Sequence, residues 1–318
     1  MENLVRRTTL KVIKGARDVK INQEMIEKIA QRWLKNKIII PEWPGKFHLE
    51  TKDQKMMLDY LIILDAINFC FWNKKDRWHI FYKDRKYNGY FALSLALKKF
   101  FERNPEKGNL KYFGEIPYQE FTAILERGKN LLFLKKRWQI ARAVSRALIK
   151  KYENSENFIN SAEKKLSNLV PKIFKQLPYF KDMAFYKGEK IYFLKRAQIL
   201  CSDIFGAFGG RGMGYFKDLD YLTCFPDYKV PQILHHFGIL EYSSTLEKKI
   251  RNKIIIPKGS NQEIEIRSGT VWGIECLKSA LEKLGKRFYS FEIDWILWDK
   301  GQRLKIKTPY HLTKTIFY

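Results

Sequence analysis

The sequence has only four cysteines in 318 residues, and no two of them form a CxxC pair. Cys70, Cys201, Cys224 and Cys276 stand singly in apolar segments, a pattern that argues against a zinc site or a disulfide framework and is typical of a reducing cytoplasm. Ten prolines and 18 glycines are too few for a collagenous or low-complexity chain. Because 45% of the residues are hydrophobic, the chain can bury a large core and a disordered protein is excluded.

The sequence also shows no secretory signal and no membrane span. The segment MENLVRRTTLKVIKG contains no apolar run that ends in a small-residue cleavage site. The most apolar stretch, residues 56–72, is interrupted by Asp59, Asp65 and Asn68, and charged groups at bilayer depth are costly. We therefore expect this stretch to be the central helix of a soluble, cytoplasmic protein that has no membrane partner.

Common catalytic motifs are missing as well. The sequence has no GxxxxGK[ST], no GxGxxG after a strand, no HExxH and no GxSxG. The glycine cluster at 206–214 follows an expected helix and is more typical of a flexible loop than of a phosphate cradle. His235 and His236 are adjacent and point to different faces of an expected helix, so we expect no metal site.

Positive charge is abundant. Sixty Lys and Arg against 34 Asp and Glu give a formal net charge of +26. A polyanionic partner, such as nucleic acid or a phosphorylated metabolite, would explain this excess. A lysine-rich, thermophilic proteome would explain it equally well, since the cations are spread along the chain and form no block.

The pattern of apolar residues predicts a mainly α-helical protein with a few short strands. Apolar residues recur at three- and four-residue spacing in most segments. Asn22 is placed as an N-cap, and Ser260 with Glu263 fits a capping box. Pro171 is expected to interrupt or kink the helical pattern around it. Gly269 and Gly273 in the last helix suggest close packing or a ligand. The expected helices are 22–34, 90–103, 137–152, 155–169, 193–208, 228–237 and 261–284, and the expected strands are 36–40, 78–82 and 289–298.

Several polar residues occupy positions where apolar ones would be expected. Asp227 precedes a helix, where a carboxylate caps helices or, held by helix N–H groups, faces a developing positive charge. Lys195 and Asp203 lie about two turns apart on one side of an apolar helix. Asp65 and Asn68 share a face of the buried helix, so they either bond neighbouring helices or line a pocket. Arg267 belongs to a charged first turn, where an ion pair with a neighbouring residue is the simplest explanation.

Four segments together resemble the motifs of the queuosine salvage family, whose members are queuosine 5′-phosphate N-glycosidases. They are LDAINFCFW, FLKRAQILCSDIFGAF, FKDLDYLTCFPDYKVPQILHHFGILEYSSTL and KGSNQEIEIRSGTVWGIECL. The resemblance is collinear from about Asp18 to Trp298. Pro226 and Lys229 stand where the family's pattern has Ala and Arg, and Ser268–Gly269 replace an Ala-type pair. The Lys229 change weakens any bidentate anion contact made there.

The same region is similar, more distantly, to helix-hairpin-helix DNA glycosylases, in which a lysine that opens one helix and an aspartate that opens a later one flank the sugar. Lys195 and Asp227 follow that order. This resemblance implies a helix-hairpin-helix glycosylase-like fold with two helical lobes around a central pocket. We expect residues 1–318 to form a single domain, with 1–150 and 151–318 as its possible lobes.

The family resemblance implies hydrolysis of queuosine 5′-monophosphate to queuine and ribose 5-phosphate, with no metal or organic cofactor because water is the second substrate. It implies that Asp227 and Lys195 are catalytic. Asp203 and Asn68 would bind the base edge or its cationic aminomethyl group. Phe71, Trp72, Phe225 and Tyr228 are the candidates for stacking on the base, and His48, Lys195, Lys229 and Arg267 are the candidates for the 5′-phosphate.

Two other functions remain open at this stage. A DNA or RNA glycosylase, or a tRNA-binding protein, agrees with the +26 charge and predicts tight, salt-dependent binding of nucleic acid. A non-catalytic helical interaction protein predicts no activity toward any nucleotide and an Asp227 that only caps its helix. The oligomeric state is not determined by the sequence.

Overall fold

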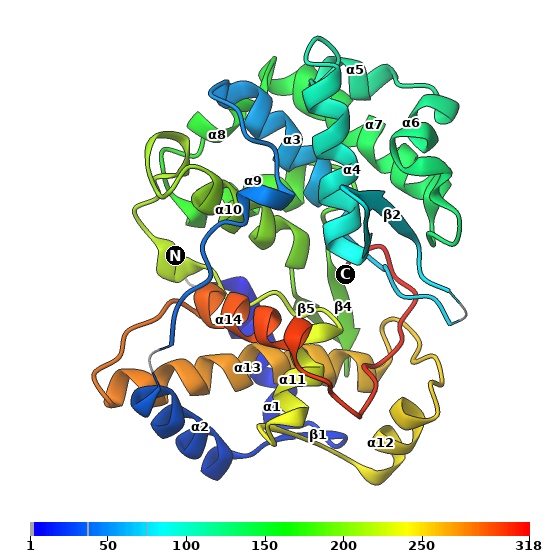
Figure 1. The fold of residues 1–318 in the computed structure, drawn as a ribbon. Helices are drawn as coiled ribbons and strands as arrows, with labels where there is room; N and C mark the ends of the chain where they lie inside the picture. The colour runs from blue at the N-terminus through cyan, green and yellow to red at the C-terminus, as the bar shows by residue number, and fades with distance from the viewer. Residues whose placement is uncertain (1–2, 37, 75) are drawn as a thin grey trace.

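The computed structural model describes residues 3–36, 38–74 and 76–318 and is mainly helical (Figure 1). Within these residues fourteen α-helices are joined by short loops, and six short strands form three two-stranded sheets. The expectation of a mainly helical protein with a few short strands is confirmed.

One group of helices surrounds α3, which is buried on all sides. Every residue from Met57 to Ala66 is buried, as expected for a central helix. None of the described helices combines the length and the apolar sequence that a bilayer crossing requires. The group consists of α3 (Gln54–Ala66), α4 (Gly89–Arg103), α5 (Leu110–Glu115), α6 (Tyr118–Ile124), α7 (Leu134–Tyr152), α8 (Ser155–Asn160), α9 (Leu166–Gln176) and α10 (Lys195–Ala207).

A second group packs around the long helix α13 and lies below the first group in Figure 1. Gly269 and Gly273 of α13 face the ribbon formed by β1 and β6, and a Cβ added at Gly269 would lie 2.8 Å from Val19 Cγ1. Close packing therefore explains these glycines. The group consists of α1 (Leu4–Lys14), α2 (Gln23–Lys35), α11 (Lys229–His236), α12 (Ser244–Arg251), α13 (Asn261–Lys283) and α14 (Ser290–Arg303).

The strands form antiparallel pairs. β2 (His79–Tyr82) with β3 (Arg85–Asn88) and β4 (Met183–Tyr186) with β5 (Glu189–Tyr192) are hairpins. β1 (Val19–Ile21) instead pairs with β6 (Leu240–Tyr242), so residues more than 200 positions apart lie side by side. This long-range pair ties the N-terminal segment to the end of α11.

Most of the expected helices are confirmed, and two N-caps behave as expected. The Asn22 side chain accepts the Met25 N–H, and the Ser260 hydroxyl accepts the Glu263 N–H. The Glu263 carboxylate, however, accepts the N–H of Gly259 and not that of Ser260, so the expected capping box is only half formed.

Three expected elements were wrong. Residues 155–169 form α8 and the start of α9, because the chain breaks at Glu163 and Lys164, which both have positive φ; Pro171 lies inside α9 and does not end it. Residues 289–298 belong to helix α14, since its buried residues recur with helical spacing. Residues 36 and 38–40 form no strand, and Lys37 lies outside the described residues.

The buried helix α3 also ends earlier than the apolar stretch suggested. Its last residue is Ala66, and Asn68, Phe71 and Trp72 belong to the following loop. The fully buried Arg137 of α7 holds this loop, because its guanidinium donates to the carbonyls of Ile67, Phe69 and Cys70. The loop is thereby fixed beside the N-terminus of α10.

Candidate active site

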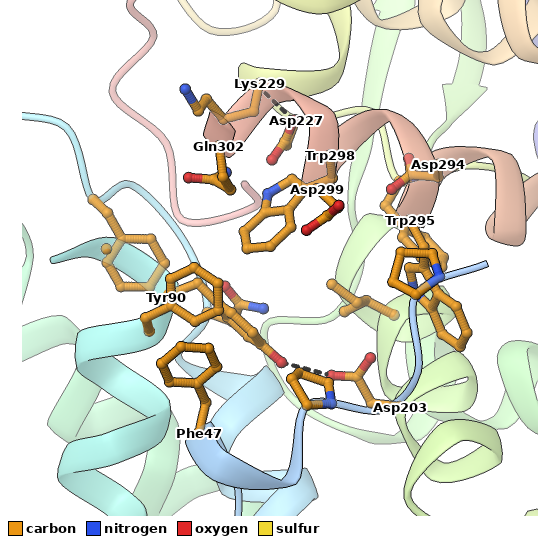
Figure 2. Close-up of a pocket in the computed structure, with 18 of the residues that line it drawn as sticks. Phe47, Tyr90, Asp203, Asp227, Lys229, Asp294, Trp295, Trp298, Asp299 and Gln302 are labelled. Carbon is orange, nitrogen blue, oxygen red and sulfur yellow. Dashed lines mark hydrogen bonds between the residues drawn. The ribbon is translucent and has the colours of Figure 1, made fainter. Parts of the chain in front are cut away.

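The main cavity among the described residues has a volume of about 610 Å³ and lies between the two helix groups. Figure 2 shows polar and aromatic side chains from both groups pointing into it. A cavity of this size suits one nucleotide and is too small for a nucleic-acid duplex. Its walls come from segments 41–48, 68–71 and 86–91, from α10, from residues 225–229, from α14 and from Tyr318.

Lys195 is the first residue of α10 and points into the cavity. The preceding residue, Leu194, has φ +53°, and the Lys195 N–H is bonded to Asp182 Oδ2 at 3.1 Å. Its ammonium group lies 3.4 Å from the Asn68 carbonyl oxygen. Burial lowers the pKa of Lys195, while the charges of Asp227, Asp65 and Asp203 oppose that effect. The lysine is therefore surrounded by carboxylates with which it interacts through space.

Asp227 lies opposite, in the turn that leads into α11. Its Oδ1 accepts the N–H groups of Lys229 at 2.7 Å and Val230 at 3.0 Å, so it caps the helix and also lines the cavity (Figure 2). Burial raises the pKa of Asp227, and the charge of Lys195 and the two N–H bonds partly offset this. Asp227 can therefore be both a helix cap and a functional carboxylate, because Oδ1 caps α11 and Oδ2 remains available.

Arg267 lies behind Asp227 and not among the residues that line the cavity. It is buried, with two hydrogen bonds to Asp182 at 2.9 and 2.6 Å, and its Nε donates to the Pro226 carbonyl at 3.1 Å. Asp182 also accepts the Lys195 N–H. One ion pair thus connects the backbone at Lys195 with the backbone next to Asp227.

Asp203 lies two turns along α10 from Lys195 and is 3% exposed. The Tyr90 hydroxyl lies 3.1 Å from its Oδ2. Figure 2 marks this hydrogen bond with a dashed line. Burial raises the pKa of Asp203 well above its usual range, and the nearby charge of Asp65 raises it further. Asp65 and Asn68 were expected either to bond neighbouring helices or to line a pocket, and the Asn68 amide donates to Asp65 Oδ1 at 3.2 Å. Asn68 lines the cavity, and Asp65 lies behind it.

His48 lines the cavity in an uncharged state. It is fully buried and stacks on Trp43 with ring centroids 4.1 Å apart. Burial, with the charge of Lys98, lowers the pKa of His48 to about 3. A neutral imidazole cannot serve as a cation for a phosphate group.

Three of the four expected stacking residues line the cavity: Phe71, Phe225 and Tyr228. Trp72 does not, because its indole N–H is turned to the Thr313 carbonyl at 3.2 Å. Lining aromatic residues that sequence reasoning missed are Trp43, Phe47, Phe69, Tyr87, Tyr90, Phe91, Trp295, Trp298 and Tyr318.

α14 supplies acidic groups that sequence reasoning also missed. Asp294 is 3% exposed, its Oδ2 accepts the Phe225 N–H at 2.9 Å, and burial raises the pKa of Asp294 well above its usual range. Asp299 and Gln302 line the cavity further along the helix (Figure 2). Helical spacing in 289–303 was the available signal, and reading this segment as a strand concealed it.

Cations gather at one part of the cavity wall. Lys229 lies there, its ammonium 5.5 Å from the ring centroid of Tyr310, and Arg77 contacts the same ring. Lys46, Lys86 and Arg303 also line the cavity. The cavity therefore combines cations with the buried carboxylates of Asp203, Asp227 and Asp294.

These features define a helical protein with a nucleotide-sized cavity in which a helix-anchored carboxylate, a lysine and aromatic walls converge. The chain belongs to the queuosine salvage protein family, whose model matches residues 47–318. The family resemblance noted from the sequence motifs is thus confirmed.

Similarity to individual proteins extends over nearly the whole chain. A Sphaerobacter thermophilus protein named queuosine 5′-phosphate N-glycosylase/hydrolase is 38% identical over 98% of this chain and 96% of its own length. Proteins of the same name from Dictyostelium discoideum and Bos taurus are 37% and 27% identical, covering 99% and 96% of this chain and 98% and 96% of their own lengths.

Proposed function

We propose that this protein is a hydrolase that cleaves the N-glycosidic bond of queuosine 5′-phosphate and releases queuine and ribose 5-phosphate. The observation that carries the proposal is the meeting of Asp227, Lys195 and aromatic walls in one nucleotide-sized cavity of a queuosine salvage family member. Release of queuine would supply the free base for tRNA modification.

Asp227 is proposed to stabilise the reacting sugar. Cleavage of the bond between C1′ and the base builds positive charge on the ribose, as in glycoside hydrolysis. A carboxylate held by two helix N–H groups is fixed in place before the reaction and needs no reorganisation. Its free oxygen is suited to orienting and deprotonating the attacking water.

Lys195 is proposed to keep Asp227 ionised. Without a cation nearby, burial would favour the neutral acid, in which form Asp227 could neither attract the sugar cation nor accept a proton. The ion pair of Arg267 and Asp182 fixes the positions of Lys195 and Asp227 relative to each other, because it is hydrogen-bonded to the backbone at Lys195 and at Pro226. Arg267 therefore acts in our proposal as a positioning residue and no longer as a phosphate ligand.

The base is proposed to lie between the aromatic side chains, where stacking contributes about 1–3 kcal/mol per base. Phe71, Phe225 and Tyr228 remain candidates from the sequence, and Trp298 joins them. Asn68 and Asp203 are proposed to bind the base edge. Asp294 offers a second carboxyl group for the cationic aminomethyl substituent of queuine.

Lys229 is proposed to bind the 5′-phosphate together with Arg77 and Lys86. All three are cationic and line the same cavity as Asp227. His48 is excluded from this role in the proposal because it is neutral. Lys229 supplies a point charge where the family pattern has Arg, so the contact is not bidentate.

The arrangement of helices is proposed to follow the helix-hairpin-helix glycosylase pattern within a single domain. The supporting observation is that Lys195 and Asp227 each open a helix and interact across the cavity between the two helix groups. In this proposal the groups around α3 and α13 correspond to two lobes.

Incubation with queuosine 5′-monophosphate, followed by chromatography for free queuine, tests the function. We expect queuine and ribose 5-phosphate in equal amounts, with no release of guanine from guanosine 5′-monophosphate. Unphosphorylated queuosine serves as the control for the phosphate site and should react more slowly. Absence of queuine release by folded protein would contradict the proposal.

Asp227→Asn tests the proposed chemistry. The amide retains the capping oxygen, so the variant should unfold at nearly the same temperature, but it cannot carry the negative charge. We expect kcat to fall at least about 10²-fold, in line with the contribution of a positioned acid or base. An unchanged kcat would remove Asp227 from the mechanism.

A further inference from the structure

A chain of buried polar groups runs from the cavity into the protein behind Asp203. Tyr90 lies 3.1 Å from Asp203 Oδ2 and 3.5 Å from His48 Nε2. On the other side of the imidazole, His48 Nδ1 lies 3.1 Å from the Tyr60 hydroxyl, which is 3.2 Å from the Ser94 carbonyl oxygen. His48, Tyr60 and Asp203 are all buried.

The proton positions along this chain follow from its inner end. The Ser94 carbonyl can only accept, so the Tyr60 hydroxyl donates to it and presents a lone pair to His48 Nδ1. Since His48 is neutral, Nδ1 carries its one proton and Nε2 is an acceptor. Toward an ionised Asp203 the Tyr90 hydroxyl donates to Oδ2 at 3.1 Å and has no second proton for His48 Nε2 at 3.5 Å. A proton on Asp203 satisfies both contacts, because Asp203 then donates to the Tyr90 oxygen and Tyr90 donates to Nε2.

The balance of buried charge favours the same assignment. Four buried carboxyl groups, those of Asp65, Asp203, Asp227 and Asp294, interact with only three cations, Lys195, Arg196 and Lys229. Asp65 Oδ2 is buried without a hydrogen-bond partner. Two neighbouring carboxyl groups with too little positive charge retain one proton between them. Asp203 is the one that faces the cavity.

We propose that Asp203 is a protonated carboxylic acid in the resting enzyme and that it gives its proton to the heterocycle as the base departs. The inference rests on the proposed function and assigns a second catalytic group to it. A 7-deazaguanine has carbon where guanine has N7, so the usual protonation site is missing and the charge of the leaving base must be neutralised elsewhere on the ring.

The proposed step balances as follows. The bond between C1′ and the base nitrogen breaks, and its electron pair goes to the base, which takes the Asp203 proton on a ring acceptor atom. The water oxygen bonds to C1′ while Asp227 accepts a water proton. Asp203 is left as a carboxylate, to which Tyr90 can turn its hydroxyl. When the products leave, solvent returns the proton to Asp203 and removes the one on Asp227.

Asp203→Asn tests the proton transfer, because the amide keeps the shape and a donor but has no acidic proton. We expect kcat for queuosine 5′-phosphate to fall about 10²- to 10⁴-fold. With 4-nitrophenyl ribofuranoside 5-phosphate, whose leaving group is stable as an anion, the loss should be below about tenfold. Asp227→Asn should slow both substrates. Equal losses on both substrates in Asp203→Asn would overturn the inference.

The pH profile with queuosine 5′-phosphate gives a test that does not need the second substrate. The wild-type rate should fall at high pH as Asp203 loses its proton. The groups that face Asp203 are Asp65 from α3, Tyr90 from α4, and Lys195 and Ser202 from α10, with Asp227 and Asp294 elsewhere in the cavity wall. Tyr90→Phe removes a hydrogen-bond donor to the Asp203 carboxylate and should move this alkaline limb of the pH profile to higher pH.

Asp65→Asn should move the same limb to lower pH, because a negative charge beside Asp203 is removed while the contact with Asn68 is kept. Asp220→Asn, at an exposed carboxylate paired with Lys278, is the matched control and should not move it. A limb that stays in place in both Tyr90→Phe and Asp65→Asn overturns the inference. If wild-type protein releases no queuine, the proposed function fails instead.

Infrared difference spectra detect the proton on Asp203 directly. Wild-type minus Asp203→Asn should contain the carbonyl band of a protonated carboxylic acid at neutral pH, and this band should shift in D2O. A carboxylate signature in its place would overturn the inference in a protein of any activity.

Discussion

At the residue scale, the site depends on how a few buried charges are held. Arg267 was a candidate both for an ion pair and for the phosphate, and the ion pair is present: its guanidinium is bonded to Asp182 and to the Pro226 carbonyl. Sequence reasoning recognised the charge and could not know its partners, because Asp182 lies 85 positions away. The consequence is that an arginine outside the cavity fixes both Lys195 and Asp227.

Arg267→Lys should lower kcat at least about tenfold and change KM little. The lysine cannot make the same hydrogen bonds, and a displacement of the catalytic groups by about 1 Å slows the reaction strongly. Unfolding free energy should fall by about 1–3 kcal/mol for the lost hydrogen bonds. Steady-state kinetics and thermal melts measure the two effects. Arg146→Lys, at the exposed two-bond contact with Glu115, is the control and should leave kcat unchanged. A loss confined to KM would indicate phosphate binding after all.

The acid side of the pH profile should report Asp227. Its ionised form is required, so kcat/KM should fall about tenfold per pH unit as pH drops below its pKa. Burial raises that pKa above the usual aspartate value, while Lys195 and Lys229 hold it down. The fall should therefore begin at a higher pH than for an exposed aspartate. A rate that is constant across the acid range would contradict the assignment.

At the element scale, the two glycines of α13 give a matched pair of positions. A Cβ at Gly269 would lie 2.8 Å from Val19 Cγ1, whereas at Gly273 the nearest atom, Ile239 Cγ2, is 3.3 Å away. Both substitutions to alanine gain about 1 kcal/mol of helix propensity. The difference between them therefore measures the packing against β1 and β6.

Gly269→Ala should unfold at a lower denaturant concentration than Gly273→Ala, because overpacking costs about 1–3 kcal/mol where the neighbour cannot move. Urea titration of the two variants and the parent measures this. Equal stabilities would mean that the β1–β6 ribbon moves away freely.

Helix α14 shows which kind of element is hardest to identify. Its sequence, SFEIDWILWDKGQR, is rich in aromatic and β-branched residues, which favour a strand by local propensity. Packing against α11 and α13 decides in favour of a helix. Asp294, Trp295 and Trp298 reach the cavity only through this helical spacing, so one wrong element removed three site residues from the prediction.

At the scale of the whole molecule, the charge of +26 agrees with both small-molecule salvage and nucleic-acid binding, so an experiment must distinguish them. The cavity has the size of one nucleotide, so we expect tRNA at physiological salt to leave queuine release from queuosine 5′-phosphate unaffected. Competition kinetics with unmodified tRNA measure this. Tight, steeply salt-dependent inhibition would favour the nucleic-acid alternative, because each neutralised phosphate steepens the salt dependence.

The sequence by itself determined the helical class, most helix positions, the family and the two residues that open α10 and α11, since helical periodicity, caps and collinear motifs are local signals. Only the tertiary structure decided which charges meet. It turned Arg267 and Trp72 away from the cavity, brought in Asp294 and Trp298, and linked Tyr90 and His48 to Asp203. The physical reason is that burial and hydrogen-bond partners set the pKa of each group and the direction in which its side chain points. Both depend on residues that are far apart in the chain.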